Sequence, residues 1–342
     1  MRILIAAGIY YPDIGGPATY ARQLVNESPG YGVETVEPLV YTKIAKKWPQ
    51  GLSHFVYFLN VLRKSRNKDL ILVTDPMSSG FPVYLASWIL RKPYVLKIGG
   101  DYAWEQSIQR FGVKELLDEF LKKKYGWKVE LMRWLESRVA KRAAAVIAPS
   151  NYLAGVAGKW GVERNKIKVI YNSISSVSRL TRKEAREKLG IKESKIILFS
   201  GGRNVPWKGF SMLREITIPD VKIVIGQFPT EIYDLWLAAC DIYLLNTGYE
   251  GFSHQILEAM FMGKSIITTD SGGNREVVEN EKNALVVEYN NKKAWTGAIN
   301  RLIGDIVLQK KLSENAVKTA QKFLDKDMVG ETVKVFKEIY GN

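Results

Sequence analysis

Short apolar runs alternate with segments of helical periodicity along almost the whole chain. This alternation is typical of βαβ units, and therefore of parallel sheets covered by helices on both faces. A first series of predicted strands comprises Arg2–Ala7, Leu70–Val73, Tyr94–Ile98, Ala145–Ala148 and Lys168–Ile170. A second series comprises Lys195–Ser200, Val221–Ile225, Ile242–Leu245, Ser265–Thr268 and Ala284–Val287. The pattern predicts an α/β protein with two Rossmann-like halves of comparable size.

A polar, serine-rich segment, Tyr171–Ser178, separates the two series and has the composition of an interdomain linker. We therefore expect an amino-terminal domain over residues 1–172 and a carboxy-terminal domain over residues 173–325. The tail has helical periodicity, and we expect the helix within residues 326–342 to pack back toward the amino-terminal domain. Ligands of such folds bind beyond the carboxyl ends of the strands, so we expect the site in a cleft between the halves.

Composition narrows the class of protein. The 342 residues are 46% hydrophobic, which is enough for a full core and excludes a disordered or coiled-coil chain. A net charge of +15 predicts an anionic partner: nucleic acid, nucleotide phosphates or an acidic membrane surface. The single cysteine, Cys240, excludes an internal disulfide, and the longest apolar run, Phe81–Leu90, is much shorter than the about 20 residues of a membrane span. We therefore expect a cytoplasmic protein without a transmembrane helix.

Two glycine-containing loops follow predicted strands and could bind phosphate. The first contains Gly15 and Gly16 just before Pro17, where a helix begins, and the amino termini of helices attract anions. A tight turn that needs a positive φ explains these glycines equally well. The second places Arg203 and Lys208 five residues apart, a pairing that suits a diphosphate, although a solvated surface loop is the simpler alternative.

Two glutamates flank the start of another predicted helix. Ser253 is a candidate N-cap, and the buried stripe that we expect comprises Ile256, Leu257, Met260 and Phe261. Glu250 precedes the helix, whereas Glu258 lies about 7–8 Å further along its axis. Carboxylates so placed could accept hydrogen bonds from hydroxyls at the two ends of a sugar nucleotide. Alternatively, this is an ordinary amphipathic helix with two incidental glutamates.

These motifs together closely resemble those of the retaining glycosyltransferases of family 4, which have the GT-B fold. The resemblance covers nearly the whole chain and rests on Gly15–Gly16, Pro149–Ser150, Arg203 with Lys208, Glu250–His254, Leu257–Met260 and Ser271–Val278. It implies an α/β, GT-B architecture of two Rossmann-like domains whose parallel sheets face a central cleft. The amino-terminal domain would bind the acceptor and the carboxy-terminal domain the nucleotide sugar.

The resemblance also implies roles for individual residues in binding a donor. Glu250 would contact hydroxyls of the donor sugar, and Glu258 the ribose. The backbone N–H groups of Gly251, Phe252 and Ser253 would face sugar and phosphate.

Further roles follow from the remaining motifs. Gly15 and Gly16 would form the family's glycine loop at the donor, and Arg203 and Lys208 would stabilise the departing diphosphate. The family is generally metal independent, so the resemblance implies no metal ion and no cofactor. The expected donor is a UDP- or GDP-linked sugar, transferred with retention to a glycan or lipid-linked acceptor.

The chain departs from the family pattern at two places. Many members have a His-Asp pair after an amino-domain strand, whereas this chain has Gly100 and Asp101 there. Asp101 is therefore a candidate for contacting sugar or acceptor. The alternative is that these residues form a structural turn. After Val221–Gly226 the chain also lacks a helix and a strand that relatives usually have, and this unit normally helps to frame the nucleobase.

Much of the positive charge is local. Residues 106–147 contain ten Lys and Arg against five acidic residues, interleaved with apolar side chains that include Leu117, Phe120, Trp127, Leu131 and Trp134. A basic amphipathic surface of this kind is typical of attachment to anionic lipid, here the cytoplasmic face of a membrane. The alternative is that these aromatic residues fill the core.

Two other functions fit parts of the pattern. One is a soluble GT-B enzyme that acts on a small acceptor, and the other is a non-catalytic basic protein that binds membrane or nucleic acid. The basic stretches do not form a helix-turn-helix, zinc-finger or ribonucleoprotein motif, so we expect no nucleic-acid partner.

Overall fold

The computed structural model describes residues 1–13, 15–35, 37–49, 51–173, 180–192, 194–324 and 326–341. The chain divides into two compact units, one of Met1–Asn172 with Asp327–Asn342 and the other of Ser173–Lys326. Of the predicted linker, residues 174–178 lie outside the described residues. No helix in the described part of the chain combines the length and apolar character that crossing a bilayer requires.

The first unit contains a seven-stranded parallel sheet in the order β2-β1-β4-β5-β6-β7, with β3 also paired to β1. Its strands are β1 (Arg2–Ala7), β2 (Glu34–Thr35), β3 (Leu39–Val40), β4 (Leu70–Val73), β5 (Tyr94–Lys97), β6 (Ala145–Ala148) and β7 (Ile167–Val169). The five strands predicted here are confirmed. The two-residue strands β2 and β3 were missed because they are too short to produce a hydrophobic pattern.

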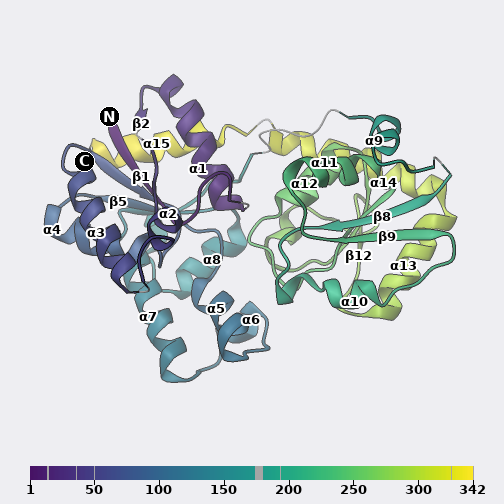
Figure 1. Cartoon of the computed structure of the whole chain (residues 1–342), viewed down its shortest axis with the longest axis horizontal. Coiled ribbons are helices and arrows are strands. Elements are labelled where there is room, and N and C mark those ends of the chain that lie inside the picture. Colours follow the sequence, from purple (N-terminus) through teal and green to yellow (C-terminus); the bar gives the residue numbers. More distant parts are fainter. Residues whose placement is uncertain are drawn as a thin grey trace. The chain divides into compact units, whose positions relative to one another are not determined.

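Helices cover this sheet, and the last of them comes from the far end of the chain (Figure 1). They are α1 (Gly16–Glu27), α2 (Tyr41–Ala45), α3 (Leu52–Ser65), α4 (Gly80–Leu90), α5 (Tyr102–Phe111), α6 (Leu117–Phe120), α7 (Trp127–Arg142), α8 (Asn151–Lys159) and α15 (Met328–Tyr340). The apolar side of α15, including Val333 and Phe336, joins the core with Ile3 and Leu24. The carboxy-terminal helix is therefore part of the first unit.

The second unit contains a five-stranded parallel sheet in the order β12-β11-β10-β8-β9. Its strands are β8 (Ile196–Gly201), β9 (Val221–Gly226), β10 (Ile242–Leu245), β11 (Ser265–Thr268) and β12 (Leu285–Val286). Its helices are α9 (Arg182–Lys188), α10 (Phe210–Arg214), α11 (Thr230–Ala239), α12 (His254–Phe261), α13 (Lys292–Gly304) and α14 (Ile306–Leu324). All five predicted strands are confirmed, with small differences at their ends.

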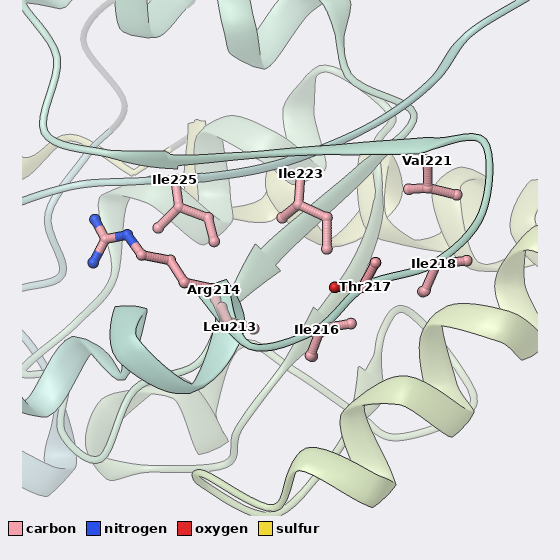
Figure 2. A pocket seen from close by; sticks show the side chains of 8 residues that line it. All are labelled: Leu213, Arg214, Ile216, Thr217, Ile218, Val221, Ile223 and Ile225. Atoms are coloured by element: carbon pink, nitrogen blue, oxygen red, sulfur yellow. The ribbon is translucent and has the colours of Figure 1, made fainter.

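Strand β9 forms an edge of the second sheet, and only Gln227–Pro229 separate it from α11. A pocket of about 280 Å³ opens beside it, between β9 and the segment that follows α10 (Figure 2). Its lining is mostly apolar and comprises Leu213, Arg214, Ile216, Thr217, Ile218, Val221, Ile223 and Ile225. None of these described lining residues is among the site residues that the sequence predicts.

A buried arginine joins the start of the second unit to its sheet. Arg186 of α9 is 1% exposed, and its guanidinium donates hydrogen bonds to the carbonyls of Ala239 (3.0 Å) and Lys195 (2.8 Å). It also pairs with the Asp241 carboxylate at 2.7 Å, which in turn accepts a hydrogen bond from the N–H of Ile197. The guanidinium thus satisfies polar groups at the ends of two strands and a helix.

We expect Arg186→Ala to lower the free energy of unfolding by about 2–4 kcal/mol, because the carbonyls of Ala239 and Lys195 would lose a charged donor and Asp241 would keep, of its two ion pairs, only that with Arg182. Urea denaturation followed by circular dichroism would measure the change. Lys282→Ala is the control, since its pair with Glu279 is exposed on both sides and should contribute less than about 1 kcal/mol. Similar losses in the two variants would contradict the prediction.

Candidate functional site

Three loops of the second unit meet beyond the carboxyl ends of their strands. One follows β8 and contains Arg203 and Lys208, the second follows β10 and contains Glu250, and the third follows β11. Backbone hydrogen bonds connect them: the N–H of Gly248 donates to the Trp207 carbonyl and that of Gly273 to the Glu250 carbonyl, both at 2.8 Å. The parallel sheet therefore assembles residues that are widely separated in the sequence.

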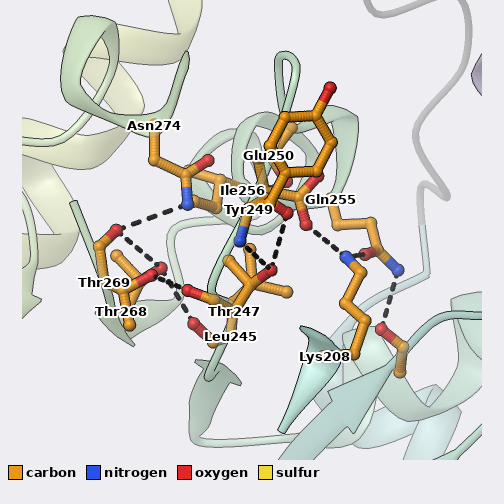
Figure 3. A network of polar contacts seen from close by, with 12 residues as sticks. Lys208, Leu245, Thr247, Tyr249, Glu250, Gln255, Ile256, Thr268, Thr269 and Asn274 are labelled. Atoms are coloured by element: carbon orange, nitrogen blue, oxygen red, sulfur yellow. Dashed lines mark hydrogen bonds and ion pairs between the residues drawn. The ribbon is translucent and has the colours of Figure 1, made fainter. Parts of the chain in front are cut away.

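Buried threonines join the loops after β10 and β11 (Figure 3). The hydroxyl of Thr269 donates to the Thr247 carbonyl at 2.6 Å, and the hydroxyl of Thr247 donates to the Tyr249 carbonyl at 2.8 Å. These bonds satisfy backbone groups that no strand partner reaches. As a result, hydrogen bonds fix the segment from Thr247 to Tyr249, which leads into Glu250.

A close backbone approach fixes the position of Glu250 itself. Gly272 has a φ of 61°, and a Cβ atom there would lie 2.1 Å from the Glu250 carbonyl oxygen. Any other side chain would therefore have to displace the Glu250 backbone as well as adopt an unfavourable φ. Gly272 of the Ser271–Val278 motif has this structural purpose, which the sequence did not reveal.

The helix that follows Glu250 begins as predicted. Ser253 is the N-cap of α12, and its hydroxyl accepts a hydrogen bond from the N–H of Ile256 at 3.3 Å. Phe252 packs on Phe323 with ring centroids 5.5 Å apart. The prediction of the buried stripe was wrong for Phe261, whose side chain is 39% exposed because it lies on the outer side of the helix.

Lys208 and Glu250 form an ion pair in which both side chains are largely buried, at 8% and 14% exposure. The Lys208 ammonium also donates to the Gln255 Oε1 atom at 3.0 Å (Figure 3). The resemblance assigns the two charged side chains to different parts of a donor, but here they contact each other. Gln255 was not among the predicted site residues; its place in the first turn of α12, five residues after Glu250, was the only available signal.

Arg203 differs from Lys208 in its surroundings. It lies exposed in the loop after β8, and it forms no ion pair with any residue in the described ranges. The following N–H, that of Asn204, donates to the Gln227 side chain at 3.2 Å. In the loop after β8, Arg203 is therefore accessible, whereas Lys208 is buried.

Glu258 lies inside α12 beside Tyr233 and Asp234 of α11. Burial, assisted by the nearby Asp234, raises the pKa of the Glu258 carboxyl to about 8, although a hydrogen bond with Tyr233 acts in the opposite direction. At neutral pH this carboxyl is mostly protonated, so that it can donate a hydrogen bond as well as accept one.

The other candidate residues belong to the first unit. Gly15 is the N-cap residue of α1 and Gly16 its first residue. Asp101 is 1% exposed and caps α5 by accepting from the N–H of Trp104 at 2.8 Å, while its other oxygen accepts from the indole of Trp160 at 3.1 Å. Burial raises the pKa of this carboxyl. This geometry fits the structural alternative, and at 1% exposure Asp101 could reach a substrate only if the residues that cover it moved.

The sequence matches two family models. Residues 17–173 match the glycosyl transferase 4-like domain, and residues 213–319 match the glycosyl transferases group 1, so the two matches together span more than half of the chain. The chain belongs to the group 1 glycosyltransferases. The predicted membership of this glycosyltransferase family is thereby confirmed.

This group 1 glycosyltransferase has relatives of moderate similarity. It is 31% identical over 199 residues to the putative glycosyltransferase YtcC of Bacillus subtilis, an alignment that covers 46% of this chain and 48% of YtcC. It is 22% identical over 237 residues to an uncharacterized 41.2 kDa protein in the cps region of Klebsiella pneumoniae, covering 62% and 66%. Neither alignment reaches two thirds of the relative's length.

Solved structures resemble the group 1 glycosyltransferase over nearly its whole length. Anabaena HepE in complex with UDP and glucose has a TM-score of 0.75 at 18% identity, covering 98% of this chain and 99% of that one. Sucrose-phosphate synthase of Thermosynechococcus elongatus has a TM-score of 0.73 at 16% identity, covering 99% of each chain. At such identities the likeness shows the fold, and the predicted α/β, GT-B fold is confirmed.

The shifted pKa of Glu258 predicts a pH-dependent effect of Glu258→Gln. Between about pH 4.5 and pH 8 the folded chain keeps a proton that the unfolded chain has released, so the wild-type chain loses stability as the pH rises through this window. Glutamine removes this dependence. The variant should therefore gain free energy of unfolding relative to wild type between pH 5 and pH 8.5, measured by urea denaturation. Glu314→Gln, at an exposed position of α14, is the control, and an equal trend in both variants would refute the assignment.

Proposed function

We propose that this chain is a retaining glycosyltransferase that transfers a hexose from a UDP- or GDP-linked donor to a hydroxyl of a glycan or lipid-linked acceptor. The observation that carries the proposal is the cluster of Lys208, Glu250 and Gln255 at the amino terminus of α12. It combines a cation, a carboxylate and a helix end, which suit a diphosphate joined to a sugar. The HepE structures with UDP and with UDP-glucose support a donor of this class.

Diphosphate binding would use both cations of the loop after β8. Arg203 is exposed and can approach the phosphates directly, whereas Lys208 must exchange its contact with Glu250 for one with phosphate. Together with the N-terminal end of α12 they would stabilise the negative charge that develops on the leaving nucleoside diphosphate. These groups can do the work of a metal ion, so we propose a metal-independent reaction without a cofactor.

The same exchange would prepare Glu250 for the sugar. Once Lys208 turns to phosphate, the Glu250 carboxylate can accept hydrogen bonds from sugar hydroxyls, while the N–H groups of Gly251, Phe252 and Ser253 face the sugar and the phosphates. Glu258 would contact the ribose diol, for which a mostly protonated carboxyl is suited. Retention would follow from attack on the face that the leaving group vacates, through an oxocarbenium-like transition state.

We assign the acceptor to the first unit, and we propose that the loop of Gly15 and Gly16 at the start of α1 can bind phosphate. Asp101 has no role in this proposal, because its carboxylate is buried and hydrogen-bonded inside that unit. A lipid-linked acceptor is consistent with one relative, a Campylobacter jejuni N,N'-diacetylbacillosaminyl-diphospho-undecaprenol alpha-1,3-N-acetylgalactosaminyltransferase. It is 29% identical over 106 residues, which cover 31% of this chain and 28% of that protein.

Helix α7 would attach the enzyme to the cytoplasmic face of the membrane. Some apolar residues of segment 106–147 fill the core and others form a surface. Leu117 and Phe120 are buried in the core, whereas Trp127, Leu131 and Trp134 are 73%, 46% and 53% exposed. The spacing of the last three places them on one face of α7.

Cations border this apolar face. Lys122, Lys124, Lys128 and Arg138 are exposed and form no ion pair within the described residues. Lys128 and Arg138 extend over the rings of Trp127 and Trp134, at 5.7 Å and 5.2 Å from the ring centroids. Exposed tryptophans with adjacent cations suit the interface of a bilayer that contains anionic lipid.

A thermal-shift panel of UDP, GDP, ADP and TDP with their sugar conjugates tests the donor site. We expect one nucleotide to raise the melting temperature, because a ligand that binds only the folded chain stabilises it.

Lys208→Ala should weaken transition-state stabilisation by about 2–4 kcal/mol, measured as the loss of kcat/KM in a transfer assay. Lys292→Ala, an exposed lysine of α13, is the control. No shift with any nucleotide would favour the alternative of a non-catalytic basic binding protein.

Sedimentation with vesicles of phosphatidylglycerol and phosphatidylcholine tests the membrane surface. We expect binding at low salt that falls as salt rises, and a large loss of binding in the double variant Trp127→Ser, Trp134→Ser. Trp88→Ser is a matched control, since Trp88 is 71% exposed on α4. Binding that is absent or indifferent to salt would overturn the proposal and favour a soluble enzyme with a small acceptor.

A further inference from the structure

We propose that Gln255 is a positioning residue that holds Lys208 and the start of the glycine loop after β8 in the arrangement that binds a diphosphate. The inference rests on the proposed function of this site and deepens it, because it names a residue that sets the affinity for the phosphates. Gln255 would act through Lys208 and the backbone rather than by touching the reacting atoms.

Both ends of the Gln255 amide are engaged, each with a different element. Its Nε2 donates to the Gly201 carbonyl at 2.7 Å, and its Oε1 accepts from the Lys208 ammonium at 3.0 Å. The first contact reaches the end of β8, and the second reaches the far end of the loop that follows it. A side-chain amide can donate and accept at once, which neither a carboxylate nor an ammonium can do.

The loop backbone is shaped to receive this side chain. A Cβ atom at Gly202 would lie 2.9 Å from Nε2 and 3.1 Å from Oε1 of Gln255, so a larger residue would push the Gln255 amide out of this place, and the φ of 146° at Gly202 is one that other residues rarely adopt. On its other side, Gly202 donates its N–H to the Gly226 carbonyl of β9 at 3.0 Å. Gly201 and Gly202 are thus held between β9 and Gln255, directly before Arg203.

Charge explains why a neutral side chain suits this position. Lys208 contacts one carboxylate, that of Glu250, and one neutral oxygen, that of Gln255. When phosphate displaces Glu250, Gln255 can still hold the ammonium without cancelling its charge. A second carboxylate at this position would instead compete with phosphate for Lys208 and repel it.

The experiment compares Gln255→Leu, Gln255→Glu and wild type in titration calorimetry. The probes are the nucleoside diphosphate that wild type binds best among UDP, GDP, ADP and TDP, and the corresponding monophosphate. We expect Gln255→Leu to weaken diphosphate binding about tenfold, as for the loss of a hydrogen bond to a charged group, with little change for the monophosphate. Gln255→Glu should weaken diphosphate binding more than Gln255→Leu, because it adds negative charge.

Gln309→Leu is the matched control. It also removes a hydrogen bond from a glutamine amide to a backbone carbonyl, that of Leu302, but at the junction of α13 and α14. We expect it to leave both affinities unchanged, although it can lower the melting temperature. A merely structural effect of Gln255 would reduce diphosphate and monophosphate binding to the same degree.

The outcomes separate this inference from the proposed function. Equal losses for the two nucleotides, no loss in Gln255→Leu, or wild-type diphosphate affinity in Gln255→Glu would each overturn the role of Gln255 while the donor site stands. If wild type binds none of the four diphosphates, the proposed function fails, and the inference fails with it.

Discussion

Glu250 is held from two sides, and the geometry of the candidate donor site depends on this arrangement. Its backbone carbonyl lies against Gly272 and accepts a hydrogen bond from Gly273, while its carboxylate pairs with Lys208. The first contact comes from the loop after β11 and the second from the loop after β8. A single residue therefore couples three loops of the sheet, so that a displacement of any one of them would move the carboxylate.

A buried ion pair of this kind is a source of specificity as much as of stability. Removing two charges from water is unfavourable, and the hydrogen bond from the Lys208 ammonium to Gln255 helps to offset this cost. A donor that supplies phosphate to Lys208 and hydroxyls to Glu250 would give each side chain a new polar partner in place of the other. Neither charge would then be left buried without a partner when the ion pair opens.

The first unit uses its polar and aromatic residues differently. Asp101 has both carboxyl oxygens bonded inside the unit, and Leu117 and Phe120 belong to its core, so these residues stabilise the fold. In contrast, the exposed tryptophans of α7 contribute little to that core. Similar residue types in one stretch of sequence thus have opposite environments, buried on α6 and exposed on α7.

The sequence alone determined the longer strands, the starts of α1 and α12, and the family. Buried parallel strands require uninterrupted apolar runs, and the caps and glycines that begin and end helices are local features, so both can be recognised without a structure. The tertiary structure alone decided that Lys208 contacts Glu250 and Gln255, that Gly272 borders Glu250, and that Asp101 is buried. These contacts join residues from different strands and loops, and no local pattern records which side chains the sheet brings together.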